Sequence, residues 1–398
     1  MIKPTARELT EMFPRNEGEE TAPYARRLVQ LAAEKGWHFE AESIRVQIHR
    51  WKRVSRKLDK HGNEVSSVER YSKPSPDVPE GFSPVKITTT HGDQHWITYQ
   101  KDSENFEFTK EFIKEVVEGL DLEPIKVTPR KTESGKILVL TYTDVHIGME
   151  TDEEGTAMYP IPWTEKEIFD CIGRFVSKIG DFWDGHDAIH VRDLGDFLDG
   201  YNGLTTRGGH KLPQNMTTAE AYKVGARFKI KLAQELARFG VPLYFHNIVN
   251  DNHAGEFAEL LNYHVQQVLA VQLPSAVYHI QRKFIEHYNY GVHSFIFTHG
   301  KDKKFCKAGM TPDLSVKNNS IIQGYINNHR LNEVVTFEKG DSHLFVNDKR
   351  KKYNYICHGA LSPSSEWVQT NFNKGRQMFS IMEVFENERE INPLCFEV

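Results

Sequence analysis

Short apolar runs alternate with longer amphipathic stretches from about residue 135 onward, and this pattern predicts strands followed by helices. In the stretch 164–179, Ile168, Ile172, Phe175 and Ile179 recur on one face, as expected of a helix that packs on a core. Alternation of this kind indicates an α/β domain with buried strands. The predicted strands are 136–142, 187–194, 242–249, 293–299 and 333–340.

The first 60 residues have a helical period instead. Leu28, Leu31 and Ala32 form one stripe of a predicted helix that ends near Gly36. A second helical stretch follows and is strongly basic, because residues 45–73 contain nine Lys or Arg and only three Asp or Glu. A basic helix that follows another helix is compatible with a helix-turn-helix.

The next 70 residues change in character. Glycine-containing turns lie between β-prone runs at 60–65 and 90–95, and they predict hairpins, the first of which would be the wing of a winged helix. An amphipathic helix is predicted at 103–120 and a polar linker at 123–136. We therefore expect a helical region at 1–60, a hairpin, helix and linker region at 61–130, and an α/β domain at 131–398.

Composition restricts the class of protein. The 398 residues carry a net charge of -5, which excludes a uniformly basic protein but not a local basic patch. The four cysteines are scattered without a C-x-x-C pair, which favours reduced thiols over a disulfide framework. The chain shows neither a signal-peptide pattern nor an apolar run of membrane-helix length. We expect a cytoplasmic protein, from a bacterium or a phage-infected cell, that does not bind membranes.

Each predicted strand ends in residues that commonly bind metals. The side chains of residues i and i+2 in an extended segment point the same way, so Asp144 and His146 are expected to act together. Ligands in open α/β sheets bind beyond the carboxyl ends of strands. Carboxylate, imidazole and amide groups together suit Mn²⁺, Fe²⁺ or Zn²⁺. The clusters, in chain order, are Asp144 and His146, Asp196 and Asp199, Asn252 and His253, His299, and Asp341 and His343.

Every cluster also has an ordinary structural explanation when taken alone. Asp144 would serve as a helix cap, His146 as a core histidine, and the GDFLDG stretch at 195–200 as a surface turn. A single His299 is more often structural than catalytic. The order of five clusters after five strands favours one shared metal site.

That order resembles the signature of the calcineurin-like metallophosphoesterases. The segments DVH, GDFLD, DNHA, TH and GDSH follow the family pattern over residues 136–345, about half of the chain. The resemblance implies a four-layer sandwich of two mixed β-sheets flanked by helices, preceded here by the helical, winged-helix-like extension. Within the family, it is similar to the DNA-repair exonucleases and to proteins common in phages.

The resemblance also implies two divalent metal ions, with Mn²⁺ preferred over Mg²⁺, Fe²⁺ or Zn²⁺, and a hydroxide held between them that attacks the phosphorus. His253 would face the scissile phosphate and assist the leaving oxygen, and Asp199 would support the site by hydrogen bonds. The implied ligands are Asp144, His146 and His343 for the first ion, Asn252, His299 and Asp341 for the second, and Asp196 as a bridge between them.

Three positions depart from the family pattern. Asp341 replaces a histidine, which either favours a harder ion such as Mn²⁺ or Mg²⁺ or weakens the second site. Asp251 replaces a glycine, and we expect it to tolerate a left-handed backbone. Ala254 replaces an acid, so that the group orienting His253 is open, with Glu256 as a candidate.

The basic residues outside the motifs suggest a polyanionic substrate. Lys301 and Lys303 follow a ligand directly, a second basic run occupies 349–352, and Arg207 and His210 lie on a glycine-rich loop expected over the substrate. Taken singly, such residues are more often solvated surface charges. The N-terminal residues expected to contact DNA are Arg45, His49, Lys52, Arg53 and Arg56.

These observations predict a metal-dependent nuclease that hydrolyses phosphodiester bonds of DNA, with an ATPase or a second copy of the chain as further partner. Two alternatives remain. One is a phosphatase or cyclic-nucleotide phosphodiesterase that acts on a small phosphoester. The other is a DNA-binding protein whose metal site has degenerated.

Overall fold

The computed structural model describes residues 12–14, 21–35, 82–89, 95–101, 112, 123–130, 132–153, 155–300, 312–372 and 376–398. The chain divides into two compact units, Met1–Asp102 and Ser103–Val398. This boundary lies N-terminal to the predicted one, and the three-region division stays a prediction.

The first unit contains one described helix and one described pair of strands. Helix α2 (Thr21–Glu34) buries Tyr24, Leu28 and Ala32 on one face, close to the predicted stripe. Strands β1 (Phe82–Thr89) and β2 (His95–Lys101) pair antiparallel, as predicted for the runs around residues 90–95. The predicted basic helix and the hairpin at 60–65 lie outside the described residues.

The second unit is built on a six-stranded mixed sheet. Its order is β13-β12-β3-β4-β5-β6, with β3 to β6 parallel and with β12 antiparallel to both of its neighbours. The strands are β3 (Lys136–Tyr142), β4 (Ala188–Asp193), β5 (Leu243–Ile248), β6 (Val277–Gln281), β12 (Met378–Phe385) and β13 (Leu394–Glu397).

A five-stranded mixed sheet lies against it. Its order is β10-β11-β9-β8-β7, with β8, β9 and β11 parallel and with antiparallel strands at both edges. The strands are β7 (Glu286–Tyr290), β8 (His293–Thr298), β9 (Val334–Lys339), β10 (Val346–Lys349) and β11 (Asn354–Cys357).

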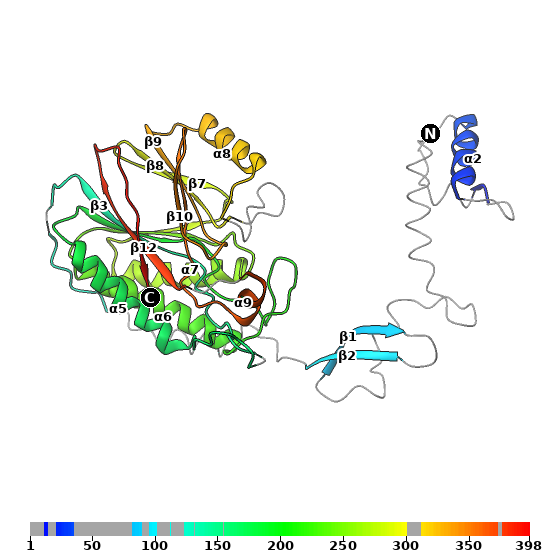
Figure 1. Ribbon diagram of the computed structural model, residues 1–398, viewed down its shortest axis with the longest axis horizontal. Coiled ribbons are helices and arrows are strands. Elements are labelled where there is room, and N and C mark those ends of the chain that lie inside the picture. Colours follow the sequence, from blue (N-terminus) through cyan, green and yellow to red (C-terminus); the bar gives the residue numbers. More distant parts are fainter. Residues whose placement is uncertain are drawn as a thin grey trace. The chain divides into compact units, whose positions relative to one another are not determined.

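Helices cover the outer faces of both sheets (Figure 1). Three of them pack on the six-stranded sheet, whereas α8 packs on the five-stranded sheet through Ile322. The helices are α5 (Glu165–Phe182), α6 (Thr218–Ala237), α7 (Glu256–Gln272), α8 (Val316–Asn328) and the short α9 (Glu366–Phe372). The fold is thus the predicted four-layer sandwich of two mixed sheets flanked by helices. Among the described helices, none combines the length and apolar character that crossing a membrane requires.

Strand β3 illustrates how the sequence forms these layers. It is buried along its whole length. Leu138 and Leu140 pack toward the helices, and Ile137 and Val139 pack toward the second sheet. Because successive side chains of a strand point to opposite faces, a continuous apolar run is what a strand buried on both faces needs.

The five strands and the helix predicted from the apolar pattern are confirmed, with ends that differ by a few residues at most. The predicted helix corresponds to α5, which begins with a capping box between Thr164 and Glu167. The remaining strands of the second unit were not predicted. Several of these, such as β7 and β10, are half-buried or exposed and lack a continuous apolar run.

Candidate metal centre

The loops after β3 and β4 are joined by backbone hydrogen bonds at the edge of the sandwich. The Asp144 amide donates to the Gly195 carbonyl at 3.0 Å, and the His146 amide donates to the Asp196 carbonyl at 3.0 Å. Five predicted ligands have positive φ, which is uncommon for residues with a Cβ and clusters at functional sites. They are Asp144 (52°), His146 (47°), Asp196 (47°), Asp341 (62°) and His343 (54°).

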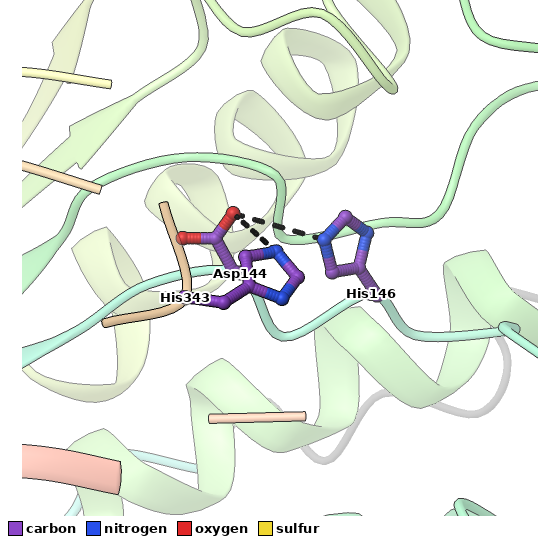
Figure 2. A group of neighbouring side chains, drawn as sticks. All are labelled: Asp144, His146 and His343. Atoms are coloured by element: carbon purple, nitrogen blue, oxygen red, sulfur yellow. Dashed lines mark ion pairs between the residues drawn. The ribbon is translucent and has the colours of Figure 1, made fainter. Parts of the chain in front are cut away.

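One group of ligands comprises Asp144, His146 and His343 (Figure 2). The Asp144 Oδ1 atom lies 3.4 Å from His343 Nε2 and 3.7 Å from His146 Nε2. This oxygen is buried and has no hydrogen-bond partner in the part of the chain that the structure describes. Burial alone would raise the pKa of Asp144, but His343 and His146 hold it well below its usual value. The carboxylate is therefore ionised and faces two imidazole nitrogens.

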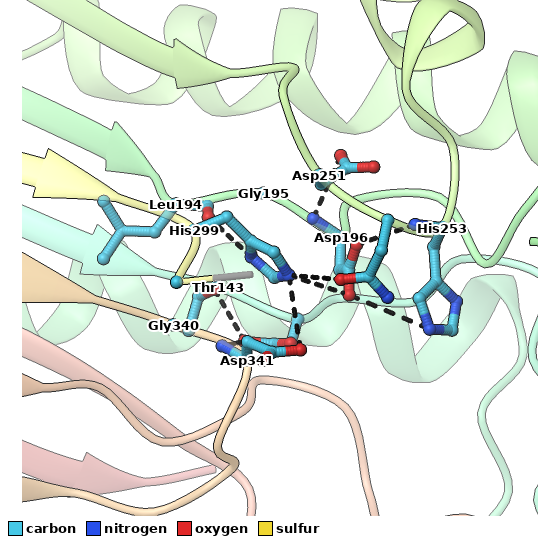
Figure 3. Close-up of polar contacts among 12 residues, drawn as sticks. Thr143, Leu194, Gly195, Asp196, Asp251, His253, His299, Gly340 and Asp341 are labelled. Atoms are coloured by element: carbon cyan, nitrogen blue, oxygen red, sulfur yellow. Dashed lines mark hydrogen bonds and ion pairs between the residues drawn. The ribbon is translucent and has the colours of Figure 1, made fainter. Parts of the chain in front are cut away.

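A second group surrounds the imidazole of His299 (Figure 3). The His299 Nε2 atom lies 3.0 Å from Asp196 Oδ2, 3.2 Å from Asn252 Oδ1 and 3.6 Å from Asp341 Oδ1. On the other side of the ring, Nδ1 lies 3.0 Å from the Leu194 carbonyl oxygen and donates to it. This bond directs Nε2 toward the carboxylates, as a metal-ligating histidine requires.

The electrostatics of both groups favour bound cations. Burial would lower the pKa of His146 and of His299, yet the surrounding carboxylates raise both pKa values well above the ordinary value. Asp196 has a lowered pKa, because His299 and His253 outweigh the effect of burial. The raised histidine pKa values show that the buried carboxylates create a negative environment. Such an environment favours added positive charge.

The donor set fits two divalent ions. Asp144, His146 and His343 would hold one ion, Asn252, His299 and Asp341 the other, and Asp196 both. Two observations support the fit: neither Asp144 Oδ1 nor Asp341 Oδ2, both buried oxygens, has a hydrogen-bond partner among the described residues. Asp341 is 4% exposed and lies at the position where the sequence predicted a ligand.

Asp199 connects the metal ligands to His253. Its Oδ1 atom lies 2.8 Å from His146 Nδ1 and 3.2 Å from His253 Nδ1. Gln214 donates to its other oxygen at 2.6 Å. The supporting role expected for Asp199 therefore has a geometric basis. Asp199 also supplies the contact to His253 that the Ala254 departure left open, whereas Glu256 is exposed at the start of α7.

Asp251 organises the turn before Asn252 in a different way from the one expected. It does not have a positive φ, so the turn does not call on the tolerance of aspartate for a left-handed backbone. Its side chain instead accepts hydrogen bonds from the amides of Asp196 (3.2 Å), Ala254 (3.0 Å) and Gly255 (2.8 Å). Burial and the nearby Asp196 raise the pKa of Asp251 to about 6. The Asp251 side chain thus links the loop after β4 to the loop after β5 through hydrogen bonds.

His253 lies at the boundary between the candidate metal ligands and a cavity. Its amide donates to Asp196 Oδ1 at 3.1 Å, and its Nε2 atom lies 3.8 Å from Asp196 Oδ2. The side chain is 17% exposed and lines a cavity of about 760 Å³. Burial would lower the pKa of His253, but Asp196 and Asp199 raise it. His253 is therefore placed next to the metal ligands without being enclosed by them.

Arg207 and His210 line the same cavity, on the wall formed by residues 205–213. The Thr206 amide donates to the His253 carbonyl at 2.9 Å, and the Arg207 amide donates to the Asn252 carbonyl at 3.1 Å. The Arg207 guanidinium donates to Asn250 at 2.8 Å. These bonds hold the wall against the metal ligands.

The other basic residues of the sequence prediction either lie outside the described residues or do not line this cavity. Lys301 and Lys303 lie outside the described residues, as do Arg45, His49, Lys52, Arg53 and Arg56. The run 349–352 does not line the cavity; Arg350 bonds to Asp348 and to Asn319 on α8. The expectation that two basic runs share the mouth of the site is therefore wrong for 349–352.

The cavity has a wall that the sequence did not identify as functional. Residues 365–368 and Thr370 line it, around the N-terminal half of α9. The preceding segment is attached to the first ligand loop, because the Ser362 amide donates to the Asp144 carbonyl at 3.1 Å. The only signal in the sequence was the turn-like stretch at 358–367, which has no recognisable ligand pattern.

Comparisons with known proteins give distant structural likenesses. No family model matches the chain, and no curated protein matches its sequence. An archaeal phosphodiesterase is 12% identical over 65% of this chain and 99% of its own, with a TM-score of 0.32. Vps29 of Entamoeba histolytica complexed with Zn²⁺ is 11% identical over 65% of this chain and 98% of its own, with a TM-score of 0.30. A predicted phosphoesterase of Streptococcus pneumoniae TIGR4 is 11% identical over 66% and 98%, with a TM-score of 0.27.

Likenesses of this size carry no weight for activity. The chain's own features are more specific: two mixed sheets between helices, five ligand clusters in a fixed order, and their convergence at one edge of the sandwich. The two-sheet fold and the convergence of the clusters are those that the sequence resemblance to the calcineurin-like phosphoesterases implies.

Proposed function

We propose that the protein is a metal-dependent phosphodiesterase that hydrolyses phosphodiester bonds of nucleic acid. One observation carries the proposal: His253 and Asp196 line one cavity together with residues of both groups of candidate metal ligands. Divalent ions held there would polarise the phosphoryl oxygens and lower the pKa of a water toward neutrality.

The residues of the chain then have separate tasks. Asp199 contacts His253 through Nδ1, so Nε2 is directed toward Asp196 and the cavity. Asp196 and Asp199 raise the pKa of His253, which favours the protonated imidazole, and the side chain is thus suited to donate a proton to a leaving oxygen. Arg207 lines the adjoining wall, where its guanidinium would contact a phosphate.

Hydrolysis of bis-p-nitrophenyl phosphate with Mn²⁺ tests the reaction type. His253→Ala should lower kcat by about a hundredfold or more while the protein still binds Mn²⁺, because His253 is not a ligand in this account. Asp196→Ala should lose both turnover and metal binding. Undiminished turnover in both variants would contradict the proposal.

The choice of nucleic acid rests on the basic N-terminal segment and on Lys301 and Lys303. End-labelled single- and double-stranded DNA, incubated with Mn²⁺ and with Asp144→Ala as control, should be degraded only by the wild type. Binding of DNA in a gel-shift assay should weaken as salt rises, since phosphate contacts release counterions.

A second candidate, a phosphoesterase of small molecules, is favoured by the cavity itself. Its volume of about 760 Å³ falls in the range of small-molecule sites, roughly 300–1,000 Å³. Turnover of cyclic or mononucleotide esters by a protein that neither binds nor cuts DNA would select this candidate. A protein that binds DNA in the gel-shift assay but binds no metal would instead be a DNA-binding protein whose metal site has degenerated.

A further inference from the structure

A large aromatic side chain lies in the same cavity as the metal ligands. Trp367 is 59% exposed and lines the cavity with His146, Asp196 and His343. An exposed tryptophan beside the candidate metal ligands is a typical contact for a planar ligand.

Trp367 is held in place by a well-anchored segment. The Glu366 amide donates to the Thr151 carbonyl at 2.9 Å, and the Glu366 carboxylate accepts from Thr156. Gln369 bonds to both the amide (2.9 Å) and the carbonyl (3.1 Å) of Tyr159. The buried Val368 adds an apolar anchor. The indole therefore belongs to a preorganised wall, which lowers the entropic cost of binding.

The remaining lining suits a heterocyclic base better than a second phosphate. Met149, Leu212 and Pro213 add apolar surface to the cavity. Its charged lining includes Glu150, Glu153 and Glu366 besides Arg207 and Lys211, and Lys211 lies 3.5 Å from Glu153. Carboxylates repel a further phosphate but accept hydrogen bonds from the amino and imino groups of base edges.

We propose that Trp367 is the stacking platform for the nucleobase attached to the scissile phosphate, so that the site takes a nucleoside phosphodiester rather than a simple alkyl phosphodiester. This inference rests on the proposed function, because the phosphate must sit on the metal ligands. It names the part of the substrate that this cavity recognises: the base and not only the phosphate.

Two substrates with the same leaving group test the proposal. Thymidine 5′-(p-nitrophenyl phosphate) carries a base, whereas methyl p-nitrophenyl phosphate does not. With Mn²⁺ present, Trp367→Ala should raise KM for the thymidine ester about tenfold and leave the methyl ester unchanged, since base–aromatic stacking has that magnitude. Trp367→Phe should restore most of the loss.

Tyr263→Ala is the matched control, because Tyr263 is 52% exposed on α7 and does not line the cavity. It should change neither substrate. Equal effects of Trp367→Ala on both esters, or none on either, would overturn the stacking proposal while leaving the phosphodiesterase proposal intact.

A wild type that hydrolyses neither ester would contradict the proposed function instead. The stacking proposal is then decided by calorimetry of Mn²⁺-loaded protein with thymidine 5′-monophosphate and with methyl phosphate. A preference for the thymidine compound that Trp367→Ala abolishes supports the platform. An absence of preference in the wild type refutes it.

Discussion

At the scale of single residues, the site depends on buried polar atoms that have no hydrogen-bond partner among the described residues. Asp144 Oδ1 and Asp341 Oδ2 each pay the cost of leaving water without forming a hydrogen bond. Their residues also adopt left-handed backbone conformations that cost on the order of 1 kcal/mol each. Such costs persist where function requires them, and here they place carboxylates where cations would bind.

Asp341 should determine which metal the second group of ligands prefers. Three oxygen donors, from Asp196, Asn252 and Asp341, surround one imidazole there, and oxygen-rich sites favour hard ions. Asp341→His exchanges an oxygen for a nitrogen, so the ratio of Zn²⁺ to Mn²⁺ affinity should rise by about tenfold or more. Competition between the two ions in equilibrium dialysis measures this ratio.

Asp341→Asn is the control for charge, because it keeps an oxygen donor. It should weaken both metals and change their ratio less than Asp341→His does. An unchanged ratio in Asp341→His would mean that this side chain does not bind the metal.

Asp199 should act through the two histidines that it contacts. Asp199→Asn keeps the shape of the side chain but removes its charge from His146 Nδ1 and His253 Nδ1. Loss of such an orienting group costs about 10- to 100-fold in metal affinity or activity. Mn²⁺ titration calorimetry should show this loss, together with an altered pH dependence of kcat. Wild-type affinity and an unaltered pH profile would rule out the role.

At the scale of elements, the centre forms where strands from different sheets end close together. Gly340, which follows β9, approaches the loop after β3 so closely that an added Cβ would lie 2.2 Å from Thr143 Oγ1 and 3.0 Å from Asp144 Oδ2. The Asp341 amide also donates to Asp144 Oδ2 at 3.0 Å. The glycine therefore sets how near the two ligand loops can come.

Gly340→Ala should therefore disturb metal binding. Separating the two loops moves Asp144 relative to Asp341, and we expect Mn²⁺ affinity to fall about tenfold or more. Gly324→Ala in α8 is the matched control, because an added Cβ there has no atom within 4 Å. The control should be neutral or stabilise the fold by up to about 1 kcal/mol. Equal metal affinity in both variants, measured by calorimetry, would contradict this account of Gly340.

The elements that could be predicted from the sequence are those whose burial produces a local pattern of apolar residues. β3 and α5 are recognisable because one is apolar throughout and the other has a regular apolar face. The half-exposed β7, with the sequence EHYNY, carries no such pattern. Assignment of strands to two sheets depends on pairing between distant segments, such as β12 with β3, which local periodicity does not contain.

The same limit applies to the site. The ligands were predictable because each follows a strand in a recognised order. The hydrogen bonds of Asp251 and the placement of Trp367 beside the ligands depend on long-range packing. The prediction for the basic run at 349–352 failed because nearness in sequence to His343 does not imply nearness to the cavity.

At the scale of the whole second unit, the two sheets enclose polar groups as well as apolar ones. Arg192 of β4 and Glu338 of β9 form an ion pair between the sheets, and Glu338 also bonds to His358 at 2.9 Å. His190 stacks on Tyr244 with a centroid separation of 4.6 Å. Burial and the neighbouring Arg192 lower the pKa of His190 to about 3. This histidine is therefore neutral in the folded protein.

Acid should destabilise the sandwich through His190. Its pKa in the unfolded chain is about 6.5, above the folded value, so the unfolded state takes up the proton first as pH falls. Stability is therefore retained above pH 6.5 and lost between about pH 6.5 and 3, by up to about 1.4 kcal/mol per pH unit. Urea unfolding at several pH values measures the slope.

His190→Gln should reduce that slope, whatever its effect on stability at neutral pH. His329→Gln, at an exposed position after α8, is the control and should leave the slope unchanged. Identical slopes in the wild type and His190→Gln would show that His190 does not contribute to acid sensitivity.

The central claim is that acids, imidazoles and one amide from five separate loops hold a pair of divalent ions. Equilibrium dialysis of the full chain against Mn²⁺, followed by metal analysis, tests it most directly. We expect two ions per chain in the wild type and a large loss in Asp196→Ala, with the fold checked by circular dichroism. A wild type that retains no Mn²⁺ above background, or an Asp196→Ala variant that retains as much as the wild type, would contradict the claim.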